Sequence, residues 1–182
     1  MNKSNEEYAL VKAEREIFLG FYSIRKLLDT FKLSPQTRKI KFRLSWSPCV
    51  GFVDYFNWHR IEELFDLEVV HEEERDIIFV CNQFIHSFIF IHVFSEDRAL
   101  AGVYVSSDRD RTKRVYFISI EQILEAFRLV GKDYPKQRFM RRKKDGQWEE
   151  YTPSTAELAA SKRALDELDE LSSSTAKSKP CF

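Results

Sequence analysis

An apolar stretch from Ile77 to Phe94 constrains the fold of this chain more than any other feature. Its 18 residues would be long enough to cross a membrane as a helix. Five polar side chains interrupt the stretch, and each would be costly in hydrocarbon without a partner: Asn82, Gln83, His86, Ser87 and His92. The pattern therefore predicts a buried helix that ends near His86, followed by a strand over 87–94. Both alternating sets of side chains in that strand are apolar, which is typical of a central strand covered on both faces.

The residues before this stretch predict a long helix and then a strand. Apolar side chains recur at helical spacing over residues 4–33. Ser34-Pro35 ends the pattern, because proline disfavours helical backbone in the residue before it. Over residues 40–46 apolar and basic side chains alternate, which predicts a strand with a basic outer face.

Three shorter helices are expected in the same part of the chain. One covers residues 57–65, with Asn57 as its N-cap. The helix of the apolar stretch is expected to begin at Glu72–Glu74, where carboxylates interact favourably with the helix dipole. The third covers residues 121–130 and ends at Gly131, placed as the C′ residue.

Together these patterns predict an α+β fold. Strands over 101–105 and 115–120 are expected to join the strand over 87–94 in an antiparallel meander. We expect a single core domain over residues 1–134, in which a long N-terminal helix and shorter helices pack on an antiparallel sheet of about four strands.

The composition changes after Pro135. Asp145-Gly146 is typical of the turn of a β-hairpin. Ser154–Glu157 matches the S/T-x-x-E capping box and precedes leucines at helical spacing. Residues 135–171 are therefore expected to form a hairpin-plus-helix appendage, and residues 172–182 a disordered tail.

Cofactor and metal motifs are missing from the sequence. It contains no G-x-G-x-x-G, Walker A or H-E-x-x-H motif, and its cysteines form no C-x-x-C pair. His71–Glu74 lacks ligands at i and i+4, and Asp108 and Asp110 alternate with arginines that would repel a cation. Residues 1–16 lack the apolar core of a secretory signal. We therefore expect a reduced, cytoplasmic protein with no cofactor, no metal and no membrane partner.

Asn82 and His86 are the candidate catalytic residues. They are four residues apart, so they share one face of the expected helix. The segment resembles the HEPN superfamily of helical ribonucleases and toxin-related domains. The signature of that family is an Arg, usually followed by a polar residue such as Asn, with a His four to six positions after the Arg. Asn82 and His86 match the Asn and His, and Cys81 stands at the Arg position. The resemblance implies RNA cleavage at a dimer cleft.

A structural interpretation of Asn82 and His86 weighs more. Polar side chains at a helix end can be satisfied by backbone groups of the junction with the next strand. On this interpretation neither residue takes part in chemistry.

Two clusters of basic residues are candidates for binding nucleic acid. They stand near the first strand and in the expected hairpin, and their members are Lys39, Lys41, Arg43, Arg138, Arg141, Arg142, Lys143 and Lys144. Cations beside aromatic side chains are typical of a groove for single-stranded nucleic acid. Residues 54–76, in contrast, carry nine acidic side chains against Arg60 and Arg75. Pairing of these opposite charges, within the chain or with a partner, is an equally good explanation.

The absence of catalytic motifs and the local charge favour a non-enzymatic interaction module. Lys plus Arg and Asp plus Glu balance at 29 each, so the charge lies in separate segments and not in the total. We expect basic and acidic surfaces that bind a protein partner or a second copy of the chain. The alternative is a HEPN-related domain that cleaves or binds RNA or another single-stranded nucleic acid.

Overall fold

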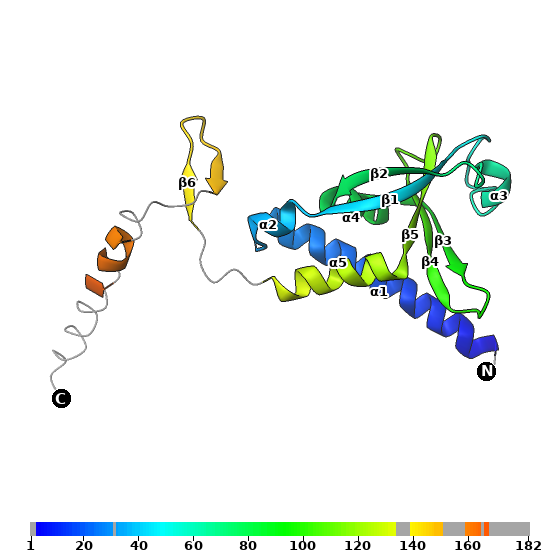
Figure 1. The fold of residues 1–182 in the computed structure, drawn as a ribbon, viewed down its shortest axis with the longest axis horizontal. Helices are drawn as coiled ribbons and strands as arrows, with labels where there is room; N and C mark the ends of the chain where they lie inside the picture. Colours follow the sequence, from blue (N-terminus) through cyan, green and yellow to red (C-terminus); the bar gives the residue numbers. More distant parts are fainter. Residues whose placement is uncertain (1–2, 31, 134–138, 151–158, 165, 168–182) are drawn as a thin grey trace, which may run out of the picture. The chain divides into compact units, whose positions relative to one another are not determined.

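The computed structural model describes residues 3–30, 32–133, 139–150, 159–164 and 166–167 (Figure 1). The chain divides into two compact units, Met1–Pro135 and Lys136–Phe182.

The first unit is an α+β fold, as predicted. Five antiparallel strands form one sheet in the order β2-β1-β5-β4-β3. Their bounds are Lys41–Pro48 for β1, His71–Asp76 for β2, Ser87–Phe94 for β3, Leu100–Ser107 for β4 and Arg114–Ser119 for β5. The helices are α1 over Lys3–Asp29, α2 over Pro35–Arg38, α3 over Ile61–Leu64, α4 over Ile77–Ile85 and α5 over Ile120–Lys132. The meander β3-β4-β5 confirms the predicted order of the last three strands.

One face of the sheet packs against α1, α4 and α5 (Figure 1). The ring of Phe21 in α1 stacks on that of Phe84 in α4, with centroids 4.0 Å apart. Phe127 in α5 packs so closely on α1 that a Cβ atom at Gly20 would lie 2.3 Å from its ring. The missing side chain at Gly20 therefore lets α1 and α5 approach each other.

The loop after β1 and the short helix α3 pack on a second apolar cluster. Its buried members are Val53, Leu64, Phe65, Ile89 and Val115. Ile89 belongs to β3 and Val115 to β5, so this cluster anchors the loop to the sheet.

The expectation that Glu72–Glu74 begins a helix is wrong, because these residues form strand β2. The strand pairs with β1, and its alternation places Glu74 opposite Arg43 and Asp76 opposite Lys41. Opposite charges on neighbouring strands stabilise the pairing. Helix α4 starts only after Asp76, whose carboxylate accepts a hydrogen bond of 2.8 Å from the backbone N–H of Phe79.

The expectation that the strand over 87–94 is central is also wrong. β3 is an edge strand that pairs with β4 alone among the described strands. The apolar character of both its faces comes from the helices on one side and the loop cluster on the other. One copy of the chain therefore covers both faces of β3 but pairs only one of its two edges.

Three helix ends differ from the sequence prediction. α1 ends at Asp29, and Ser34 caps the new helix α2, with Pro35 in its first turn. α3 begins after Arg60 and not at Asn57, whose side chain is used inside the preceding loop. α5 continues through Gly131, which lies within the helix and has no positive φ angle.

The second unit contains the predicted hairpin. β6 covers Met140–Arg142 and β7 covers Trp148–Glu150, with Arg141 opposite Glu149. Gly146 has a φ angle of +86°, which only glycine adopts without strain, so the Asp145-Gly146 turn signal is explained. Residues 159–164 and 166–167 are helical. The capping box Ser154–Glu157 and the tail 172–182 lie outside the described residues.

No helix in the described ranges combines the length and the apolar character that crossing a membrane requires.

A partly buried carboxylate ties β2 to the rest of the sheet. Glu73 accepts hydrogen bonds from Arg75, at 2.8 and 2.9 Å, and from the Tyr116 hydroxyl, at 2.6 Å. The guanidinium of Arg114 lies 3.5 Å from the same carboxylate. Burial raises the pKa of Glu73, but these hydrogen bonds and the two positive charges outweigh it, so the pKa lies below its ordinary value of 4.5. Burial and the bond to Glu73 raise the pKa of Tyr116 well above its ordinary value.

We predict that Glu73→Gln lowers the free energy of unfolding by about 1–3 kcal/mol, because it weakens charge-assisted hydrogen bonds to groups that are partly buried. Chemical denaturation followed by circular dichroism measures the loss. Glu74→Gln, an exposed position of the same strand, is the control and should change stability by less than about 0.5 kcal/mol. Equal effects of the two substitutions would contradict the role assigned to Glu73.

The lowered pKa of Glu73 also predicts how its contribution depends on pH. A carboxyl group whose pKa is lower in the folded state contributes stability above its unfolded pKa, near 4.5, and loses it as the pH falls through the folded value. The stability difference between wild type and Glu73→Gln should therefore be constant from pH 6 to about pH 5 and shrink below pH 4.5. Denaturation series at several pH values test this, and a difference that grows on acidification would refute it.

Candidate functional site

Asn82 and His86 are four residues apart at the C-terminal end of α4, and both line one polar cleft. The cleft has a volume of about 340 Å³ and lies between the C-terminal half of α4 and the turn after β4. Its other lining residues are Phe79, Gln83, Ser107, Asp108, Arg109 and Asp110. The His86 side chain is exposed, and its backbone N–H closes the last turn of α4 by bonding to Asn82 O at 3.1 Å.

A hydrogen-bond network that the sequence did not predict forms the wall of this cleft. The buried Gln83 accepts a bond of 2.9 Å from the Ser107 N–H and donates one of 2.8 Å to Asp110. The Ser107 hydroxyl bonds to the same carboxylate at 3.3 Å. These bonds fix the turn after β4 onto α4, so the interior of the network is satisfied and has a structural role.

The charges at the cleft do not favour a phosphate. Among the lining residues, the two carboxylates of Asp108 and Asp110 outnumber the single guanidinium of Arg109. Arg25 of α1 donates a bond of 3.3 Å to Asn82 but forms an ion pair with Asp29.

The position that corresponds to the HEPN arginine lies in the apolar core. Cys81 is fully buried, and burial raises the pKa of its thiol to about 12. It therefore contributes neither a positive charge nor a thiolate to the cleft.

The basic residues near β1 lie beside acidic ones. Lys39, Lys41 and Arg43 are exposed, and Arg43 lies 4.0 Å from Glu72 of the neighbouring strand. Lys41 is paired in register with Asp76. Much of the positive charge of this strand is thus balanced by β2.

The second basic cluster belongs to the second unit. Arg141 and Lys143 form ion pairs with Glu149 across the hairpin, at 2.6 and 3.4 Å. Arg142 and Lys144 are exposed. Arg138 lies outside the described residues. The hairpin therefore balances part of its positive charge with Glu149.

Over the described residues, no three His, Cys, Asp or Glu side chains gather as a metal site requires.

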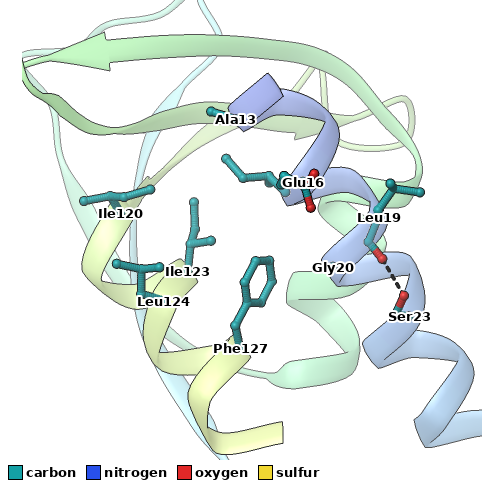
Figure 2. Close-up of a pocket in the computed structure, with 10 residues that line it drawn as sticks. Ala13, Glu16, Leu19, Gly20, Ser23, Ile120, Ile123, Leu124 and Phe127 are labelled. Carbon is teal, nitrogen blue, oxygen red and sulfur yellow. Dashed lines mark hydrogen bonds between the residues drawn. The ribbon is translucent and has the colours of Figure 1, made fainter. Parts of the chain in front are cut away.

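An apolar groove runs between α1 and α5 (Figure 2). Its volume is about 520 Å³, and Figure 2 shows Ile123 and Phe127 of α5 pointing toward α1. Leu19 and Leu124 are partly exposed at its margins, 55% and 40% respectively. Glu16 is the charged residue in its lining and forms an ion pair with Arg15. Nothing in these side chains selects one kind of ligand.

A loop rich in exposed aromatic side chains follows β1. We call residues 50–58 the aromatic loop. Four of its large apolar side chains face solvent, with exposed fractions of 64% for Val50, 78% for Phe52, 78% for Tyr55 and 86% for Phe56. Several large apolar side chains exposed on one folded loop make it a candidate site of interaction.

Internal hydrogen bonds hold the aromatic loop in one conformation. Asp54 Oδ1 accepts bonds from the backbone N–H groups of Phe56 and Asn57, at 2.8 and 3.0 Å. Asn57 Oδ1 accepts from Asp54 N at 2.8 Å, and Asn57 Nδ2 donates to Phe52 O at 2.7 Å. The loop interior is thereby satisfied while its aromatic rings remain outside.

The first half of the aromatic loop is anchored to the rest of the unit. Val53 is 2% exposed and belongs to the apolar cluster under the loop. The N–H groups of Val50 and Gly51 donate to Leu64 O, at 2.8 and 3.2 Å. The exposed aromatic side chains therefore stand on a folded base, and their exposure is not a consequence of local disorder.

The surface that follows the aromatic loop is acidic. Glu62, Glu63 and Glu68 are exposed, and Arg60 forms an ion pair with Glu63 at 3.6 Å. Sequence reasoning did not identify the aromatic loop as a site. The available signal was aromatic residues without helical or strand periodicity around Asp54-x-x-Asn57, a spacing that suits reciprocal turn bonds.

No protein-family model, curated protein or solved structure matches this chain.

Proposed function

We propose that this chain is a protein-binding module that presents the aromatic loop to a partner. The partner would offer an apolar cleft with basic residues at its rim. The observation that carries the proposal is the exposure of Val50, Phe52, Tyr55 and Phe56 on a loop that is folded by its own hydrogen bonds.

The energetics of burial support this proposal. Covering one large apolar side chain contributes roughly 1.5–3 kcal/mol, so two or three of these rings supply much of the affinity of a specific complex. The bonds of Asp54 and Asn57 fix the backbone before any partner arrives. Little conformational entropy is then lost on binding, which favours affinity.

The neighbouring charges indicate the chemistry of the partner. The exposed side chains of Glu62, Glu63 and Glu68 favour a basic surface and accelerate its approach at low salt. The same charges repel nucleic-acid phosphates and the anionic headgroups of membranes. A basic protein surface is therefore the best complement to the aromatic loop.

One observation favours the alternative, a HEPN-related domain that binds or cleaves RNA. Asn82 and His86 share a cleft with Arg109, which places an amide, an imidazole and a guanidinium around one space. The carboxylates of Asp108 and Asp110 in the same lining count against phosphate binding. We therefore rank this alternative second.

An RNA-cleavage assay separates the two functions. We predict that wild type and His86→Ala have the same effect on the length of total RNA, because the two carboxylates of the cleft repel phosphate groups. Gel analysis of the RNA is the measurement, and His59→Ala, another exposed histidine, is the control. Cleavage by wild type and His59→Ala that His86→Ala loses would support the nuclease and contradict our ranking.

Capture from a lysate of the source cells, followed by titration, tests the aromatic loop. We predict that Phe52→Ser/Phe56→Ser weakens binding of the captured protein at least about a hundredfold, because two anchor rings are removed. Tyr8→Ser/Tyr22→Ser is the matched control, because these aromatic residues of α1 are 73% and 59% exposed. Binding should also weaken as salt rises, and Glu62→Gln/Glu63→Gln should reduce that salt dependence.

Two outcomes would overturn the proposed function. The first is an unchanged dissociation constant for Phe52→Ser/Phe56→Ser. The second is an equal loss of binding in the α1 control. That result would show that binding depends on exposed apolar area in general and not on this loop.

A further inference from the structure

The two edges of the sheet differ sharply in their chemistry. One edge is β2, in which five of six residues are charged, from Glu72 to Asp76. The other edge is β3, whose sequence Ser-Phe-Ile-Phe-Ile-His-Val-Phe has no Asp, Glu, Lys or Arg and no proline. Charged residues and proline are the usual means by which an edge strand avoids pairing with another chain. β2 is protected in this way and β3 is not.

The middle of β3 is regular enough to accept another strand. Its pairing with β4 shifts register between Ser87 and Ile89 and again between Val93 and Phe94, and the residues between these shifts are in uninterrupted register. Within the described part of the chain, no backbone hydrogen bond reaches Ser87–Phe94 from any segment other than β4. The outer N–H and C=O groups of Ile89–Val93 are thus open to a strand from outside the chain.

We propose that β3 pairs antiparallel with β3 of a second copy of this chain, about a two-fold axis near Ile91. The pairing joins the two sheets into one. Ile91 then lies opposite the partner's Ile91, and Ile89 lies opposite the partner's Val93.

Self-pairing would give β3 the second neighbouring strand that it lacks in a single copy of the chain. Residues 87–94 have the composition of a central strand, yet one copy supplies only one neighbouring strand. The second copy supplies the other. A strand can pair antiparallel with itself about a two-fold axis, so the contact is closed and gives a dimer.

The side chains at this edge favour a second copy over a charged peptide. Ile91 and Val93 are half-buried, and Phe94 is 48% exposed. Apolar and β-branched side chains placed opposite one another stabilise antiparallel pairs. A register centred on Ile91 also brings Phe88, which contacts Tyr55 with ring centroids 4.9 Å apart, toward the partner's Phe94.

Sedimentation equilibrium over a range of protein concentrations tests the dimer. Wild type should be dimeric at micromolar concentration. Ile91→Lys should raise the dimer dissociation constant at least about a hundredfold, because it sets two like charges against each other at the axis. Ile91→Thr keeps a β-branched residue and should retain the dimer, and Tyr22→Lys places the same charge on an exposed site of α1 as a control.

Two further measurements keep the proposal open to refutation if Ile91→Lys fails to fold, which circular dichroism would reveal. Phe94→Lys changes a more exposed residue and should also weaken the dimer. Hydrogen exchange of the wild type should show amides of residues 89–93 that become more protected as concentration rises.

A wild type that is monomeric at all concentrations would overturn the proposal. So would a dimer that Ile91→Lys and Phe94→Lys leave intact, or one that only Tyr22→Lys disrupts. A monomer whose β3 amides become protected only on addition of another protein would identify a peptide of that protein as the occupant and would equally refute the dimer. Phe52 and Phe56 lie outside the proposed pairing, so this experiment can fail while the aromatic-loop proposal holds, and the reverse.

Discussion

A single partly buried carboxylate, Glu73, ties strand β2 to the rest of the sheet. β2 carries three consecutive glutamates, and their mutual repulsion in isolation opposes an ordered strand. Glu73 turns toward the helix side of the sheet, where Arg75, Arg114 and Tyr116 converge on it. Glu72 and Glu74 turn the other way and meet the basic residues of β1. β2 gives the sheet a charged edge on that side, and the opposite edge of the same sheet is the uncharged strand β3.

The parts of the fold that could be predicted from sequence are those with local causes. Helical spacing was enough to predict α1 and α5, and alternation was enough to predict β1. α4 was predicted from an apolar run that polar residues interrupt, and β4 and β5 were expected as two further strands joined by a polar turn. The helix–strand junction at His86–Ser87 was predicted because Asn82 and His86 interrupt an apolar run at helical spacing. The strand β2 was missed because its stability comes from residues distant in the sequence, such as Tyr116, 43 residues after Glu73. The place of β3 in the sheet was missed for the same kind of reason, since burial of a strand's faces does not reveal whether both of its edges are paired.

In the candidate sites, too, features with local causes could be predicted from sequence, and features that depend on distant residues could not. The placement of Asn82 and His86 on one helix face follows from helical geometry and was predictable. The charge that surrounds them was not, because Asp110 and Arg25 come from other elements. The basic residues of β1 were identified correctly as exposed, but their neutralisation by β2 requires the strand pairing to be known. The aromatic loop was missed because exposed aromatic residues between elements have no periodicity, and only the bonds of Asp54 and Asn57 distinguish a folded loop from a flexible one.

The two proposed interaction surfaces use different interactions, burial of apolar area for the aromatic loop and backbone hydrogen bonding for β3. Together they affect the affinity for a bivalent partner. The aromatic loop offers apolar area that a partner must cover, whereas β3 offers unpaired backbone groups that another strand must satisfy. If β3 joins two copies, each dimer carries two aromatic loops on one rigid sheet. A partner that is itself dimeric, or that repeats its basic cleft, then binds the second loop as an intramolecular event at high effective concentration. Because the loop is already ordered and the joined sheet fixes the spacing, little flexibility is lost at the second contact. Disruption of β3 pairing would therefore weaken capture of a bivalent partner without any change to the loop itself, while binding of a monovalent partner would stay the same.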